Sequence, residues 1–233
     1  MLASEIITDV RRELLESNAG FWSDSELLRH LNRAQMDFVN RTRILEDQAF
    51  LSTTDNVRDY PLPDNWMSAK LVLFNSKKEA DDDDSWIRLR PTSLEKMGQE
   101  NPNFLNSPDN EESQPYQYFI WNKRIYLYPN PRAVVSGDLY LFYKSKPIQL
   151  TATTQSIEID ETLSEALTAY VLWKCWAKAK ETALATEQKG IYAGYIGEGR
   201  RWAKRRSGDQ RYKVDIISPI SFNEGTSFDN FWR

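Results

Sequence analysis

The sequence predicts an α+β fold in which helices from both ends of the chain form a bundle, with an antiparallel β-rich region inserted between them. Apolar residues recur at helical spacing near both ends, short β-leaning runs fill the middle, and the last stretch has no period. We therefore divide the chain into an N-terminal helical hairpin (1–47), a β-rich insertion (48–159), C-terminal helices packing with the hairpin (160–206) and an extended C-terminal arm (207–233).

Two amphipathic patterns open the chain. The first predicts a helix over 4–17, with "NAG" at 18–20 as its stop signal. The second predicts a helix that begins at "WSDSELL" and runs to about residue 44. Ser23 and Glu26 have the spacing of a capping box, in which each side chain satisfies an unpaired amide at the helix start. Only a few residues join the two helices, so we expect a helical hairpin.

The middle of the chain contains short β-leaning runs separated by Asp, Asn and Pro. The predicted strands are "QAFLSTT", "RDYPLP", "SAKLVLF", "SWIRLR", "YQYFIW", "RIYLYP", "DLYLFYKS" and "SIEID" (156–160). Asn122-Lys123 predicts a tight hairpin turn, although the Gly usual at the second position is missing. Thr92 and Glu95 predict a short helix over 93–98.

Both alternating sets of the predicted hairpin contain apolar residues. Ile125 and Leu127 point to one face of the strand, and Tyr126 and Tyr128 point to the other. Such a sheet needs cover on both faces, either from helices of the same chain or from another subunit.

Two helices are predicted near the C-terminal end. Asp160 is the expected cap of a helix over 161–181, whose segment 166–177 is almost wholly apolar, so this helix is central to the fold or shared with a neighbour. A second helix is predicted over 184–206 despite its glycines. The spacing of Gly190, Gly194 and Gly197 would allow close approach of another backbone, and it does not match a phosphate-binding loop.

Composition excludes several classes of protein. The net charge of −4 gives no general sign of nucleic-acid binding, and a single cysteine excludes a disulfide framework or a zinc quartet within the chain. Neither a signal peptide nor a membrane span is recognisable, so we expect an intracellular product without membrane association. Eight Trp, eleven Tyr and ten Phe favour protein interfaces, although a well-packed core would also use them.

No group of residues indicates an enzyme. We interpret the single histidine, His30, as an exposed helical residue and Cys175 as a buried small residue. The run "DDDD" at 81–84 lacks the spacing of a calcium loop and reads as a solvated loop, although a bound cation is not excluded. We predict no catalytic residue, no metal site and no cofactor.

Positive charge is concentrated near the C-terminal end. Segment 170–213 has eleven Lys or Arg against four Asp or Glu, or +7, which leaves −11 for the rest of a chain whose total is −4. The candidate basic docking surface consists of Arg200, Arg201, Lys204, Arg205 and Arg206. Three roles remain open for it: contact with DNA phosphates, docking on an acidic protein surface, or a solvated helix end.

The arm contains aromatic residues but no helical or strand period. We predict that it docks on a partner, and the alternative is a frayed end. The candidate anchors are Ile216, Ile217, Ile220, Phe222, Phe228, Phe231 and Trp232.

Several segments, taken in order, resemble the head-to-tail adaptor (connector) proteins of tailed bacteriophages. They are "WSDSELLRHLNRAQMDFVNRTR", "YPLPDNWMSAKLVLFN", "YFIWNKRIYLYPNP", "SEALTAYVLWKCWAKAKE" and the C-terminal tail. The resemblance implies a structural protein of the virion neck, assembled in the host cytoplasm as a ring, commonly of twelve copies. Its implied partners are the portal protein, the tail or the next neck protein, and genomic DNA that passes without sequence-specific binding. The alternatives are a nucleic-acid-binding packaging factor that uses 200–206 and a tail-completion protein.

Overall fold

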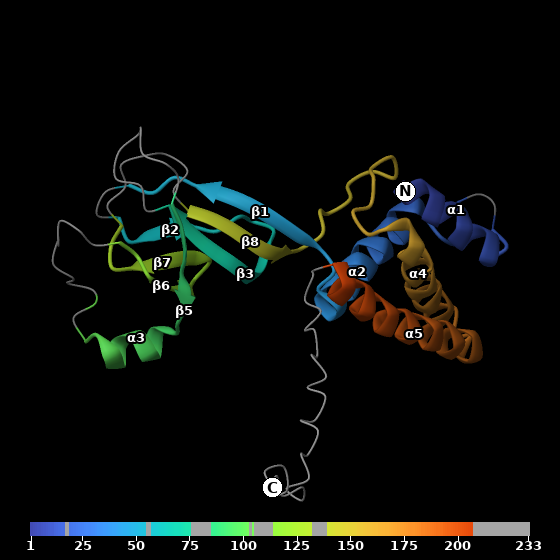
Figure 1. The fold of residues 1–233 in the computed structure, drawn as a ribbon. Coiled ribbons are helices and arrows are strands. Elements are labelled where there is room, and N and C mark those ends of the chain that lie inside the picture. Colours follow the sequence, from blue (N-terminus) through green and yellow to red (C-terminus); the bar gives the residue numbers. More distant parts are fainter. Residues whose placement is uncertain are drawn as a thin grey trace, which may run out of the picture.

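The computed structural model describes residues 1–16, 19–54, 57–75, 85–102, 104, 114–131 and 139–206. Within these residues, helices α1, α2, α4 and α5 gather at one end of the molecule, and the strands and the short α3 lie at the other (Figure 1). The predicted α+β class is therefore confirmed. No described helix is long and apolar enough to cross a membrane.

The helices from both ends of the chain share one core. They are α1 (Ala3–Glu13), α2 (Asp24–Thr42), α4 (Ser164–Lys178) and α5 (Thr182–Arg206). Their fully buried side chains include Ile6, Leu27, Leu31, Phe38 and Leu167. The apolar helix α4 packs against each of the other three, so its composition reflects a central place in the bundle.

Helix α1 ends earlier than predicted. The sequence predicts helix to residue 17, but Leu14 is the C-cap and Leu15 has the left-handed backbone angle φ 54°. The Leu15 side chain is 93% exposed. A leucine that only extends the apolar pattern therefore does not pack on the bundle.

Helix α2 begins where the capping pattern predicts. The Ser23 hydroxyl accepts a hydrogen bond from the Glu26 amide at 3.3 Å. The Glu26 carboxylate instead accepts from Lys178 Nζ of α4 at 2.7 Å. The cap is therefore present, and its acidic partner joins two helices.

In the part of the chain that the structure describes, eight strands form two sheets of four. They are β1 (Glu46–Leu51), β2 (Asp59–Pro61), β3 (Trp66–Asn75), β4 (Trp86–Arg88), β5 (Arg90–Pro91), β6 (Gln117–Trp121), β7 (Arg124–Tyr128) and β8 (Leu139–Ser145), in the orders β1-β8-β3-β4 and β2-β7-β6-β5. All described pairs are antiparallel except β5 with β6, which is parallel. One apolar core lies between the sheets and includes Val72, Phe74, Ile125, Leu127, Leu139 and Leu141.

The predicted β6–β7 hairpin turn is confirmed. Asn122 and Lys123 have φ of 47° and 60°, so both turn residues are left-handed, as the I′ type requires. On one face of the hairpin, Ile125 and Leu127 are fully buried between the sheets. On the other, Tyr126 and Tyr128 pack against Met97 of α3 (Leu94–Glu100) and its neighbours, so the second face is covered by this chain's own helix.

Three local predictions need correction. The cap of α3 is Ser93, whose hydroxyl accepts from the Lys96 amide at 3.1 Å, and not Thr92. Residues 156–160 do not form a strand; Ser156 makes only an isolated bridge to Leu2. Asp160 caps a short 3₁₀ helix, Glu161–Leu163, before α4 begins at Ser164.

The close approach predicted for the glycines of α5 occurs at a different glycine. A Cβ added at Gly190, Gly194 or Gly197 would meet no atom within 4 Å, so these glycines face open space. A Cβ at Gly199 would lie 2.7 Å from the Phe38 ring and 2.8 Å from the Thr42 methyl group. Gly199 is thus where α5 closes on α2.

Candidate functional site

Cys175 and His30, the two residues that the sequence offered for side-chain chemistry, do not have the surroundings of a reactive group. Burial raises the pKa of Cys175 to about 12, so this thiol stays protonated near neutral pH. Within the described residues, no group of three or more His, Cys, Asp or Glu could hold a metal ion. The acidic run 81–84 lies outside the described residues.

His30 is buried, which corrects the prediction of an exposed histidine. Its side chain lies on the inner side of α2, and neither ring nitrogen has a hydrogen-bond partner. Burial lowers the pKa of His30, although the Glu26 carboxylate, 3.8 Å from Nε2, acts in the opposite direction. The ring therefore favours its neutral form and serves packing.

The predicted basic residues lie in the last two turns of α5. Arg200 and Lys204 line a pocket of about 340 Å³ together with Arg41 and Arg43 at the end of α2 and Lys144 of β8. Arg206 instead lies over the Trp202 ring, 5.1 Å from its centroid. The structure thus adds three cations that sequence reasoning missed, because they come from distant elements.

Part of this basic charge is paired within the chain. Arg41 Nε lies 2.9 Å from Asp37 Oδ2, and Lys144 Nζ lies 2.5 Å from Glu46 Oε1. Burial alone would raise the pKa of Glu46, but hydrogen bonds from Lys144 and Lys70 hold it below its ordinary value. Arg200 Nε donates to the Arg41 carbonyl at 3.0 Å. The carboxylates of Asp37 and Glu46 therefore partly neutralise the charges of Arg41 and Lys144 at the basic pocket.

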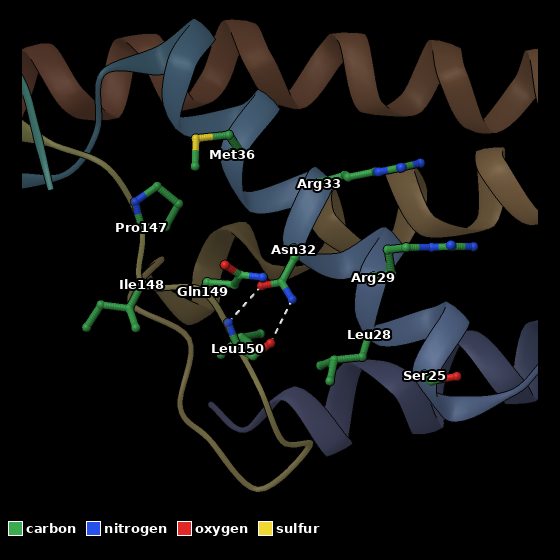
Figure 2. A pocket seen from close by; sticks show the side chains of 10 residues that line it. All are labelled: Ser25, Leu28, Arg29, Asn32, Arg33, Met36, Pro147, Ile148, Gln149 and Leu150. Atoms are coloured by element: carbon green, nitrogen blue, oxygen red, sulfur yellow. Dashed lines mark hydrogen bonds between the residues drawn. The ribbon is translucent and has the colours of Figure 1, made fainter. Parts of the chain in front are cut away.

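A second pocket, of about 440 Å³, lies between the outer face of α2 and the segment 147–150 (Figure 2). We call it the α2 groove. The lining residues are Ser25, Leu28, Arg29, Asn32, Arg33 and Met36 of α2 and residues 147–150. On the helix they recur every three or four residues, so they form one continuous stripe opposite the buried face.

The Asn32 amide fixes the distance between the two walls of the groove. Asn32 Nδ2 donates to the Leu150 carbonyl, and the Leu150 amide donates to Asn32 Oδ1, both at 2.8 Å. These bonds, drawn as dashed lines in Figure 2, hold the extended segment along the helix. The contact joins residues 118 positions apart, which no local sequence pattern indicates.

The groove is apolar inside and basic at one rim. Figure 2 shows Leu28 and Met36 projecting toward the 147–150 segment, whereas Arg29 and Arg33, which also line the pocket, project away from that segment. Ile148 is 60% exposed and Met36 is 38% exposed, so apolar atoms on both walls face solvent.

The outer face of the β1-β8-β3-β4 sheet carries exposed aromatic rings. Phe50 of β1 stacks on Tyr140 of β8 with ring centroids 3.8 Å apart, and Trp86 of β4 lies 6.0 Å from Tyr140. Phe50 is 57% exposed. Exposed aromatic clusters are typical of protein interfaces.

The candidate anchors of the arm, from Ile216 to Trp232, lie outside the described residues. A family model described as "SU10 adaptor protein" matches residues 1–214, which agrees with the resemblance predicted from the sequence. No curated protein matches the chain.

Proposed function

The chain belongs to the SU10 adaptor protein family, a family of structural phage proteins, and we propose that it is a head-to-tail adaptor that forms a ring of twelve copies beneath the portal. The ring would extend the DNA channel and provide the platform for the tail or the next neck protein. The observation that carries this proposal is the family match over residues 1–214.

The exposed aromatic face of the sheet supports an assembly role. Phe50 and Trp86 are exposed and both contact the half-buried Tyr140 ring, so an interface that uses these packed rings would lose little side-chain entropy on binding. We propose that this face contacts a neighbouring subunit or the tail side of the neck.

We propose that the arm 207–233 docks on the portal. Its apolar side chains would serve as anchors, and each is worth about 2–3 kcal/mol if fully buried. Repetition around a ring multiplies such contacts by avidity. Outside segment 170–213 the chain carries −11, and an acidic body is compatible with DNA sliding through the channel without adhering.

A chain that ends at Gln210 tests the docking role. We expect it to keep the circular dichroism spectrum of the full chain, because the described helices and strands end at Arg206. It should no longer co-sediment with the portal of the same phage. Portal binding equal to that of the full chain would refute the docking role of the arm.

Ring assembly has its own test. The free adaptor must stay soluble until packaging ends, so we expect the ring to require portal or a high protein concentration. Light scattering across a dilution series measures this, and a stable twelve-subunit particle at low concentration would contradict it.

The alternative function, nucleic-acid binding in packaging, rests on the basic pocket. Arg41, Arg43 and Lys144 add cations to the predicted surface of α5. Binding to phosphates would weaken steeply with ionic strength, whereas an aromatic arm on portal would hold. DNA and portal binding measured at low and high salt distinguishes the two functions.

A further inference from the structure

We propose that the α2 groove binds the C-terminal segment 214–232 of the same chain. The groove pairs an apolar interior with a basic rim, so its occupant should carry apolar side chains and carboxylates together. Such a ligand is an acidic, aromatic-rich peptide in extended form.

The composition of segment 214–232 fits this groove. It contains Asp215, Glu224 and Asp229 but no Lys or Arg. Its apolar residues are Val214, Ile216, Ile217, Ile220, Phe222, Phe228, Phe231 and Trp232. Apolar side chains would enter between Met36 and Ile148, and carboxylates would face the guanidinium groups of Arg29 and Arg33.

The C-terminal end of α5 contacts the C-terminal end of α2, the helix that forms one wall of the groove. Arg200 of α5 donates to the carbonyl of Arg41, which lies five residues beyond Met36 on α2. The six residues from Arg200 to Arg206 add about 9 Å of helix. The linker 207–213 spans up to about 24 Å when extended. Segment 214–232 can therefore reach the groove without distortion of α5.

The short linker favours the same chain over a second copy. A short flexible linker gives an effective concentration of about 1 mM or more at its target. In a dilute solution of free subunits, the chain's own segment therefore outcompetes that of a neighbour. In the virion, portal would compete for the same apolar residues and release them, a step that rests on the proposed function.

Cysteine cross-linking in the full chain tests the contact. The native Cys175 is fully buried, so Met36→Cys with Phe228→Cys provides two reactive thiols. Ile191→Cys with Phe228→Cys is the control pair, because Ile191 is 42% exposed against 38% for Met36 and lies on α5, outside the groove. The rate of disulfide formation in each pair is divided by the alkylation rate of the variant that carries only Met36→Cys or only Ile191→Cys. This division removes differences in thiol reactivity between the two positions.

We expect the Met36 pair to form an intrachain disulfide about fivefold faster than the Ile191 pair, at a rate independent of protein concentration. Equal rates for the two pairs would overturn the proposal. A disulfide that joins two chains would overturn it as well and assign the groove to a second copy.

Charge reversal tests the basic rim. Arg29→Glu with Arg33→Glu should slow the Met36 cross-link about threefold or more at low salt and less at high salt. The control pair, Arg12→Glu with Lys96→Glu, makes the same change of charge on α1 and α3 and should leave the rate unchanged. Equal slowing by both pairs of substitutions would refute the proposed contact between Arg29, Arg33 and the carboxylates of the segment.

The cross-link is measured without portal, so it is independent of the docking role. If the chain ending at Gln210 still binds portal while the Met36 pair cross-links, the proposed docking fails and the groove contact stands. If portal binding is lost on truncation and the two cysteine pairs behave alike, the docking role stands and the groove contact fails.

Discussion

His30 is the chain's only histidine and is buried without a hydrogen-bond partner for its ring, which makes it a direct probe of the helical core. Burial lowers its pKa below 6.5 in the folded chain, so the unfolded chain binds the proton more readily. The free energy of unfolding should therefore fall as pH drops through 6.5, until the lowered pKa of the folded chain is passed.

We predict a loss of up to about 1.4 kcal/mol per pH unit in this window. Urea unfolding of the wild type and of His30→Leu between about pH 7.5 and about pH 5.5 measures it, since other side chains seldom titrate there. The variant should show a flatter profile. Parallel profiles would mean that the folded chain accepts the charged ring.

Gly199 offers a test of packing between α2 and α5. In Gly199→Ala the new methyl group would lie 2.7 Å from the Phe38 ring, which is fully buried and cannot move freely. We expect the free energy of unfolding to fall by about 1–3 kcal/mol. Gly194→Ala is the control, because its methyl group meets open space and should stabilise α5 by up to about 1 kcal/mol. Thermal unfolding of both variants measures these changes. Equal changes in stability would exclude a close approach of α5 to α2 at Gly199.

The β6–β7 hairpin shows what an element gains from its turn residues. Lys123 has φ 60°, a conformation that costs a residue with a Cβ about 1–2 kcal/mol and glycine almost nothing. Lys123→Gly relieves this strain in the folded chain but also gives the unfolded chain more conformational freedom, which offsets part of the gain. We therefore expect the free energy of unfolding to rise by about 0.5–1 kcal/mol.

Lys123→Ala is the matched control for that change. It removes the side chain but keeps the Cβ, so the backbone strain remains and stability should change little. Chemical unfolding of the two variants separates the contributions of backbone and side chain. An alanine variant as stable as the glycine variant would place the cost in the lysine side chain instead.

Elements defined by local pattern were predictable from the sequence. The cap at Ser23, the turn at Asn122-Lys123 and the uninterrupted α5 follow from spacing and turn chemistry. The end of α1 was not, because Leu15 continues the apolar pattern of the sequence but its side chain is 93% exposed in the described structure. The α2 groove and the basic pocket depend on contacts between residues more than 100 positions apart, such as Asn32 with Leu150 and Arg200 with Arg41.

At the scale of the whole molecule, the helical part and the sheets have separate cores. Among the described residues, the buried core of the helices contains no residue of a strand, although the partly buried Met67 of β3 packs against it. The two cores meet where β1 leaves α2 and β8 leads back toward α4. This arrangement suggests that the helical part can fold without the sheets.

Removal of residues 46–144 tests this independence. Glu46 and Lys144 are direct partners across β1 and β8, and the Ser145 amide donates to the Leu45 carbonyl at 3.1 Å. Antiparallel partners have Cα atoms about 5 Å apart, so a linker of about three glycines joins Leu45 to Ser145 without strain.

We expect the shortened chain to keep its helical circular dichroism signal and to unfold cooperatively. A shortened chain without cooperative unfolding would show that the sheets complete the helical core. If it does fold, the sheets serve mainly as an interaction surface carried by the bundle, and portal or tail binding can then be assigned to one part by assaying the full and shortened chains side by side.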